Sequence, residues 1–186
     1  MMSIEDRTKE YRSKIAELSG QIWPSSDAKS DIELEVVYGE AADKILSITR
    51  AAFAEYEGKL NPPSGAANST LEEISSQIAE GGAVLATLDN NPVGSALFRL
   101  RPDHLYIGRL SVLPGYRGRG VASAVLRLCE QIAMNVGLKE LRLGTRVSMP
   151  RNIALYERHG YVITGYVKHP GGDGTDTIVH MTKRLN

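Results

Sequence analysis

Features that would support a disulfide framework, a metal site or a membrane anchor are scarce in this sequence. Its single cysteine is Cys129, so no disulfide can form within the 186-residue chain. The four histidines are scattered and contain no His-x-x-x-His pair, so we expect no metal site. No run approaches the roughly 20 apolar residues that span a bilayer, and residues 1–7 lack the apolar core of a secretory signal. We therefore expect a cytoplasmic protein without a membrane partner.

An excess of charge of either sign is also absent. Lysine and arginine together number 22, as do aspartate and glutamate, so no overall field attracts nucleic acid or a membrane surface. We expect no nucleic-acid partner. The chain is 42% hydrophobic and 24% charged, which is typical of one globular domain with a sizeable core. Any ligand preference must therefore arise locally.

A loop rich in glycine and arginine, residues 113–120, separates a strand pattern from the longest helix pattern of the chain. Apolar residues dominate 105–112, and they recur at helical spacing from 121 to 136. The first N–H groups of a helix lack acceptors within the helix and carry partial positive charge. Glycines let the backbone approach an anion closely, while Arg117 and Arg119 add charge that can bind phosphate in a bidentate manner. The loop therefore predicts a pyrophosphate site.

Several interpretations of this loop compete. A P-loop is excluded, because no Lys-Ser or Lys-Thr pair follows a glycine. The dinucleotide fingerprint fits only in part, because Ser123 stands where its third glycine is required. A plain glycine-arginine turn is a further alternative. The pattern Arg/Gln-x-x-Gly-x-Gly/Ala is matched by Arg117, Gly120 and Ala122. It resembles motif A of the GCN5-related N-acetyltransferase (GNAT) superfamily, which holds the pyrophosphate of acetyl-coenzyme A (acetyl-CoA).

A second stretch, residues 145–161, resembles the C-terminal signature of the same superfamily. An asparagine-bearing turn at Asn152 is followed by Tyr156 and, after three residues, by a Gly-Tyr pair. The stretch departs from the pattern at Met149, where many relatives carry asparagine. The two motifs stand in the expected order and at the expected separation, and together the resemblance covers roughly residues 33–185.

Periodicity and turn residues predict an ordered series of helices and strands. We expect helices at 8–23, 41–59, 121–136 and 152–158, and a further helix that runs from a capping box at Ser69 or Thr70 to about residue 80. We expect strands at 34–38, 83–88, 93–100, 105–112, 138–147, 161–167 and 177–182. The first helix is either a docking arm or a helix that packs on its own domain. A strand, helix, strand unit across 105–147 predicts a parallel pair.

The predicted fold class is α/β (α+β), with the GNAT fold. We expect a mixed central sheet of about seven strands with a splayed parallel pair, about four helices and an N-terminal helical extension. The predicted domain division is an amphipathic helix and linker at 1–30 and an acetyltransferase domain at 31–186.

The resemblance implies roles for particular residues. Backbone groups of Leu110, Ser111 and Val112 would bind the pantetheine arm and the acetyl carbonyl, where fixed N–H groups can stabilise an oxyanion. Tyr156 would protonate the leaving thiolate, unless its ring only packs between helix and sheet. Asn152 would bind amides of the coenzyme, unless it only caps the short helix. The pyrophosphate would be held by backbone N–H groups of Arg117, Gly118, Arg119, Gly120, Val121 and Ala122.

The base that deprotonates the acceptor amine is less clearly indicated. Some relatives carry a glutamate where this chain has Tyr106, while Glu55 and Glu57 could act through water or simply face solvent. The loops at 61–67 and 170–176 are expected to border the acceptor, which could be a protein N-terminus, a lysine, a polyamine, or a small amine metabolite or antibiotic.

The sequence therefore predicts an N-acetyltransferase that uses acetyl-CoA as co-substrate and transfers its acetyl group to a primary amine. Two alternatives remain: a non-catalytic acyl-CoA sensor or interaction module of the same fold, and a dinucleotide-binding protein. A homodimer is an expectation at the level of the family only.

Overall fold

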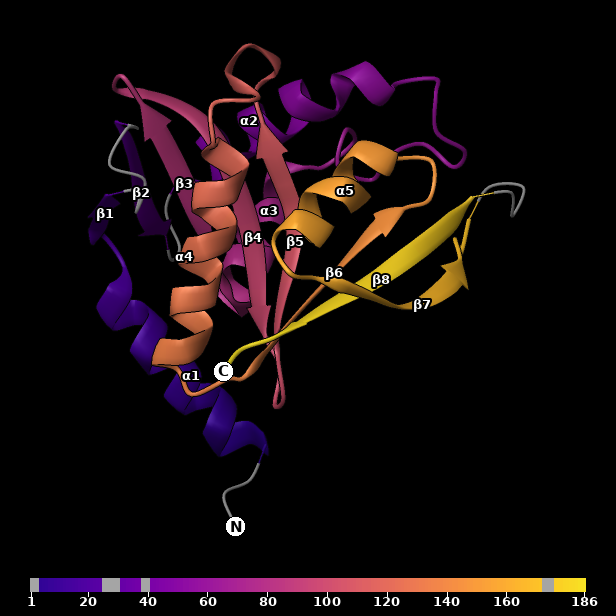
Figure 1. Ribbon diagram of the computed structural model, residues 1–186. Coiled ribbons are helices and arrows are strands. Elements are labelled where there is room, and N and C mark those ends of the chain that lie inside the picture. Colours follow the sequence, from indigo (N-terminus) through magenta and orange to yellow (C-terminus); the bar gives the residue numbers. More distant parts are fainter. Residues whose placement is uncertain (1–3, 25–30, 38–40, 172–175) are drawn as a thin grey trace.

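A computed structural model describes residues 4–24, 31–37, 41–171 and 176–186 (Figure 1). The expected linker at 25–30 lies outside these residues, as does the part of the expected acceptor loop at 172–175. Within the described ranges, no helix combines the length and the apolar character needed to cross a bilayer.

In the part of the chain that the structure describes, the core is a sheet of eight strands in the order β1-β2-β3-β4-β5-β6-β8-β7. Six neighbouring pairs are antiparallel, while β5 and β6 run parallel. The strands are β1 (Ile22–Pro24), β2 (Ile32–Val37), β3 (Gly82–Leu88), β4 (Asn91–Leu100), β5 (Leu105–Val112), β6 (Glu140–Arg146), β7 (Val162–Lys168) and β8 (Thr177–Arg184). The mixed sheet that the sequence predicts is confirmed, with eight strands in place of about seven.

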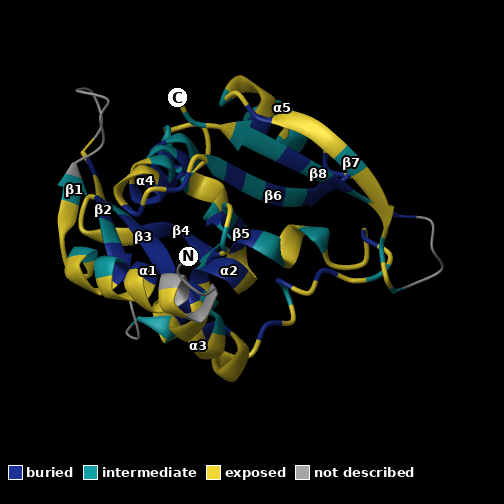
Figure 2. Ribbon diagram, turned by 90° about the horizontal axis from the view of Figure 1, so that it is seen from below, coloured by how far each residue is buried: buried dark blue, intermediate teal, exposed yellow. Residues whose placement is uncertain are grey.

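Helices cover both faces of this sheet, as Figures 1 and 2 show. The α-helices of the described residues are α1 (Ile4–Leu18), α2 (Ala42–Phe53), α3 (Leu71–Glu80), α4 (Val121–Asn135) and α5 (Pro150–Arg158), which match the expected four helices and the N-terminal helical extension. Two short 3-10 helices, η1 (Ala54–Tyr56) and η2 (Pro114–Tyr116), follow α2 and β5. The predicted capping box starts α3, since Thr70 and Glu73 exchange both bonds at 3.1 Å.

The two faces have separate apolar clusters. Residues of α2 and α3 pack with Leu85 and Leu97 of the sheet, whereas α4 packs with alternate residues of the same strands, such as Ala86 and Phe98. Tyr156 of α5 belongs to the α4 cluster, so α4 and α5 share one face. The N-terminal helix joins this cluster through Tyr11 and Ile15.

The first helix is shorter than its apolar spacing predicts. It ends at Leu18, and Gly20 follows with a φ of 75°, a left-handed conformation that commonly ends helices. Ile22 continues the helical spacing but lies in β1, where it is 67% exposed and pairs with Glu35 of β2. The prediction of a helix to residue 23 is therefore wrong, because Ile22 does not belong to a buried stripe.

The parallel pair separates partway along its length. Register pairs join β5 to β6 at three positions, the last of which is Ile107 with Leu143, although β5 continues to Val112. A bulge in β5 accompanies the separation: its register against β4 slips by one residue, and Arg109 has a φ of 50°. The splayed pair is thus present as predicted.

Candidate active site

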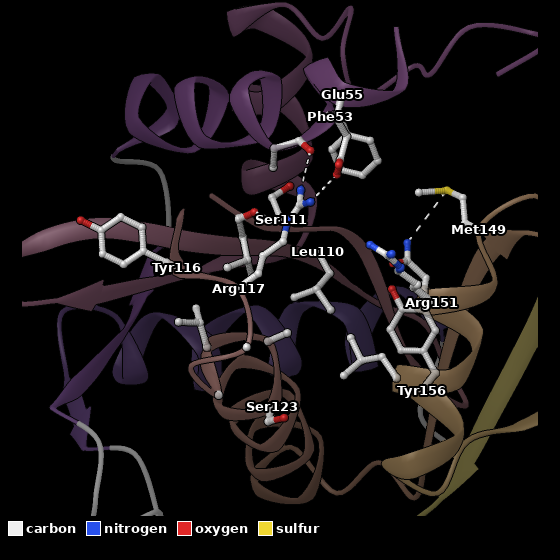
Figure 3. A pocket seen from close by; sticks show the side chains of 18 of the residues that line it. Phe53, Glu55, Leu110, Ser111, Tyr116, Arg117, Ser123, Met149, Arg151 and Tyr156 are labelled. Carbon is white, nitrogen blue, oxygen red and sulfur yellow. Dashed lines mark hydrogen bonds and ion pairs between the residues drawn. The ribbon is translucent and has the colours of Figure 1, made fainter. Parts of the chain in front are cut away.

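A cavity of about 500 Å³ lies where β5 leaves β6 and α4 begins (Figure 3). Its wall is formed by the end of α2 with η1, the last residues of β5, the entrance of α4, and α5. Of the site residues that the sequence predicts, all except Arg119 line this cavity. Segments more than 100 residues apart in the chain therefore meet at one place.

The entrance of α4 lies at the cavity and has no described side-chain cap. Gly120 is the N-cap with a φ of 86°, and no described side chain caps the helix. The first helical bond runs from the Ala124 N–H to the Gly120 carbonyl at 2.9 Å, so the preceding N–H groups have no acceptor within the helix. Gly118 has a φ of 76°, and a Cβ at Gly118 or Gly120 would meet no described atom within 4 Å. Glycine is therefore required at these two positions for its backbone conformation, and both glycines line the cavity.

The Arg117 side chain is not aimed at this terminus. Its Nη2 donates to the Ala52 carbonyl at 2.9 Å, its Nε donates to the Val112 carbonyl at 3.2 Å, and its guanidinium forms an ion pair with Glu55. The guanidinium thus joins the loop to the end of α2 and to η1. The expectation that this side chain binds phosphate directly is replaced by a structural role. The backbone N–H of Arg117, also expected at the pyrophosphate, donates to the Pro114 carbonyl at 3.3 Å.

The second loop arginine points elsewhere. The Arg119 guanidinium lies over the Tyr116 ring, 5.6 Å from its centroid, and Arg119 lies outside the cavity wall. The cationic side chains on that wall, besides Arg117, are those of Arg151 and Arg158 from α5. Positive charge therefore reaches the cavity mainly from a helix that the loop motif does not include.

The last residues of β5 present backbone to the cavity. Leu110, Ser111 and Val112 line it, and they lie beyond the last register pair with β6. On their other side Ser111 and Val112 pair with Ser95 and Gly94 of β4. Ser111 is 2% exposed, and its hydroxyl donates to the Arg109 carbonyl at 2.9 Å. The edge of β5 that faces the gap is thus held rigidly from one side.

Tyr156 projects from α5 into the cavity (Figure 3). Its ring is buried and packs edge-on against Tyr161, with the centroids 6.0 Å apart. Burial raises the pKa of the Tyr156 phenol, and the neighbouring phenols of Tyr106 and Tyr56 raise it further. The phenol therefore keeps its proton at neutral pH and can donate it.

Asn152 also faces the cavity rather than capping α5. Met149 is the N-cap residue, without a cap bond from any described side chain, and the Asn152 amide nitrogen lies 3.9 Å from the Met149 sulfur. Capping of α5 by Asn152 is therefore not observed, and its binding to amides of the coenzyme stays a prediction. Asn152 thus lies beside the position where many relatives carry asparagine.

Several cavity residues were not identified from the sequence. Phe53 and Tyr56 line the cavity. In the sequence they have the spacing of inward apolar residues of the helix expected at 41–59, and this spacing does not indicate a ligand site. Ser123 bonds to His159 at 2.9 Å between its hydroxyl and Nε2, and burial, followed by Arg127, lowers the pKa of that imidazole. Of the two carboxylates considered as bases, Glu55 lines the cavity and is paired with Arg117.

The two loops expected to border the acceptor, residues 61–67 and 170–176, are both attached to Arg146 at the end of β6. Arg146 donates to the carbonyls of Pro62 and Pro63 at 2.6 and 3.2 Å, and it forms a buried ion pair with Asp176 at 2.9 Å. Ser148 donates to the same carboxylate at 3.2 Å. Among the described residues, no cluster of three or more histidine, cysteine or acidic side chains could hold a metal ion.

The sequence matches curated relatives over part of its length. It is 34% identical over 85 residues to the mouse protein named "Probable N-acetyltransferase family 8 member 5", covering 46% of this chain and 37% of that protein. It is 35% identical over 73 residues to "N-alpha-acetyltransferase MAK3" of Arabidopsis thaliana, covering 39% of this chain and 38% of that protein. The chain thus spans less than two fifths of the length of each.

Comparison of folds and of family models extends this likeness. The structure of a GNAT family acetyltransferase from Elizabethkingia anophelis with acetyl-CoA bound aligns with a TM-score of 0.63 at 19% identity, covering 84% of this chain and all of that one. That similarity shows a shared fold. The family model for acetyltransferase (GNAT) matches residues 45–161, which is more than half of the chain. The chain therefore belongs to the acetyltransferase (GNAT) family.

Proposed function

We propose that this protein is an acetyl-CoA-dependent N-acetyltransferase that transfers the acetyl group directly to a primary amine. The observation that carries the proposal is the meeting of three features in one cavity. These are the uncapped entrance of α4, the unpaired edge of β5 at residues 110–112, and the buried phenol of Tyr156. An anion site, a strand edge and a proton donor are what a coenzyme A thioester requires along its length.

The residues present fit the coenzyme. The N–H groups at the start of α4, together with that of Gly118, would hold the pyrophosphate. Backbone groups of residues 110–112 would pair with the pantetheine arm, while Asn152 would bond to its amides. The related structure with acetyl-CoA bound shares this fold, which supports the same assignment here.

The chemistry needs stabilisation of an oxyanion and protonation of a leaving thiolate. N–H groups on the β5 edge are fixed donors, so they would stabilise the tetrahedral oxyanion without reorganisation. Tyr156 would then donate its proton to the thiolate. A thiol has an ordinary pKa of about 8.5. Burial raises the pKa of the Tyr156 phenol, so the phenol stays protonated until the thiolate leaves beside it.

The acceptor is proposed only as a primary amine. One curated relative is named as an N-alpha-acetyltransferase, which makes the α-amine of a peptide the first acceptor to test. Lysine, spermidine and propylamine cover side-chain, polyamine and minimal alkyl amines. A cytoplasmic location, a homodimer and the division into residues 1–30 and 31–186 stay predictions.

The test uses the purified full chain with acetyl-CoA and each of these amines. We expect release of free coenzyme A thiol that requires both the protein and an amine, with an acetylated amine detected by mass spectrometry. Acetyl-CoA binding without thiol release in the presence of any amine would refute the enzyme and support the non-catalytic acyl-CoA sensor. Tight binding of NAD without binding of coenzyme A would favour the dinucleotide-binding alternative.

A further inference from the structure

A hydrogen bond joins the end of α5 to the entrance of α4. Nε2 of His159, the residue that follows α5, lies 2.9 Å from the hydroxyl oxygen of Ser123. Ser123 is the third residue of α4, and it lines the cavity together with Val121 and Ala122 (Figure 3). Its hydroxyl therefore connects an imidazole that is not part of the cavity wall to the helix entrance proposed to hold the diphosphate.

The Ser123 hydroxyl has a single proton, so the direction of that proton matters to an anion in the cavity. When Nε2 of His159 carries no proton, it accepts the hydroxyl proton, and the serine oxygen has only lone pairs left for the cavity. When Nε2 carries a proton, it donates to the serine oxygen, and the hydroxyl proton is available to an anion. An imidazolium carries a proton on both ring nitrogens and therefore fixes the second arrangement.

The charged groups that face His159 compensate little for a positive charge on its ring. They are Arg127 and Glu130 of α4, Lys183 of β8 and Arg158 of α5. The carboxylate of Glu130 is already bonded to Lys183, with 2.7 Å between Oε1 and Nζ. Burial, followed by Arg127, lowers the pKa of the His159 imidazole. In the protein without a ligand, the ring is therefore mostly neutral at pH 7.

We propose that His159 is a positioning residue for the coenzyme, because its protonation directs the Ser123 hydroxyl toward the diphosphate and makes binding tighter as the pH falls. This inference rests on the proposed function, which places a diphosphate at the entrance of α4. The diphosphate would supply the negative charge that the groups around His159 do not provide. Coenzyme binding is then coupled to uptake of a proton by a residue that the coenzyme does not touch.

The sign of the pH dependence follows from the pKa of His159 in the two states. In the free protein this pKa lies below its ordinary value of about 6.5, and a nearby anion should raise it by about one unit. One unit corresponds to about a tenfold change in the dissociation constant between the fully protonated and the fully neutral ring. The additional affinity is therefore present at low pH and is lost as the pH rises through the pKa of the complex.

The test measures the dissociation constant of dephospho-coenzyme A by calorimetry between pH 5 and pH 8. This probe keeps the diphosphate but lacks the 3′-phosphate, whose own pKa of about 6 would obscure that of the imidazole. We expect the unaltered protein to bind the probe about five- to tenfold more tightly at pH 5 than at pH 8. The histidine ring signals in NMR spectra should show a His159 pKa that rises by about one unit when the probe is added.

Three variants assign the pH dependence to this pair. His159→Gln retains an N–H that can donate to Ser123 but never gains a charge, so its dissociation constant should change by less than about twofold over the same range. It also identifies the His159 signal in the NMR spectrum by its absence. Ser123→Ala leaves only a screened charge interaction, so its pH dependence should be less than about threefold. His104→Gln changes a histidine paired with Asp103 and should retain the full pH dependence.

The outcomes separate this inference from general damage and from the proposed function. Thermal unfolding at pH 7 shows whether each variant has folded, and the His159 pKa of the unaltered protein serves as a test that does not depend on the variants' binding. A His159 pKa that the probe leaves unchanged, or a full pH dependence in His159→Gln, would overturn the inference and leave acetyl transfer standing. The expected pH profile without transfer to any amine would support the inference and refute the enzyme. Absence of coenzyme binding at every pH would overturn both.

Discussion

The Arg117 guanidinium provides the sharpest test of the site, because the sequence and the structure assign it different partners. In the structure it donates to the carbonyls of Ala52 and Val112 and pairs with Glu55. A guanidinium bound to phosphate would instead leave the end of α2 unattached to the loop. Replacement by alanine removes all of these contacts at once.

The expected magnitude follows from those contacts. Each of the two hydrogen bonds contributes about 1 kcal/mol net, while the ion pair, with side chains 39% and 38% exposed, adds less than about 1 kcal/mol. Arg117→Ala should therefore lower the free energy of unfolding by about 2–3 kcal/mol. At roughly 2–4 °C per kcal/mol for a chain of this size, the melting temperature should fall by about 5–10 °C.

The assay combines thermal unfolding with acetyl-CoA binding measured well below the melting temperature. The dissociation constant should rise by less than about tenfold, since the pyrophosphate is assigned to backbone N–H groups. Glu55→Gln is the matched control: it removes only the ion pair, so its melting temperature should fall by less than about 3 °C. A binding loss of about 100-fold with unchanged stability in Arg117→Ala would place the guanidinium on the phosphate and refute this reasoning.

Three further outcomes are expected. Tyr156→Phe should reduce kcat by about 10²–10⁴-fold with an unchanged acetyl-CoA dissociation constant, measured by steady-state kinetics and calorimetry; unchanged kcat would leave Tyr156 a packing residue. Burial raises the pKa values of Tyr156 and Tyr161 above the ordinary value of about 10, so their contribution to stability is complete below pH 10 and is lost above it. Denaturant unfolding should show this decline, and Tyr156→Phe should lessen it. Thr70→Ala removes the capping box of α3 and should cost about 1 kcal/mol, or a few degrees of melting temperature, without altering kcat.

Local features of the site could be predicted because they depend on neighbours in the chain. Gly118 and Gly120 permit the left-handed conformations that start α4, and Thr70 with Glu73 starts α3. The strand, helix, strand order around α4 also predicts a parallel pair. In these cases the interacting groups lie a few residues apart, or the connection allows few arrangements.

Other features depend on contacts that spacing does not reveal. Ile22 has the spacing of a helical residue, yet pairing with β2 places it in a strand. The carbonyl partner of Arg117, Ala52, is 65 residues away, so nothing near Arg117 in the sequence indicates that its side chain bonds to the end of α2. Gly144 has residues of two other strands close to its Cα, Tyr106 of β5 and Ile178 of β8, because β6 lies between β5 and β8 in the sheet.

The sequence by itself determined the glycine-rich entrance of α4, the order of the elements from β2 onward and the chemical character of Tyr156, because each is set by local backbone preference or residue type. Only the tertiary structure decided which side chains remain available to a ligand and which face of the gap each one occupies. The physical reason is that hydrogen-bond partners and strand neighbours are chosen by packing across the sheet, between residues that are distant in the chain.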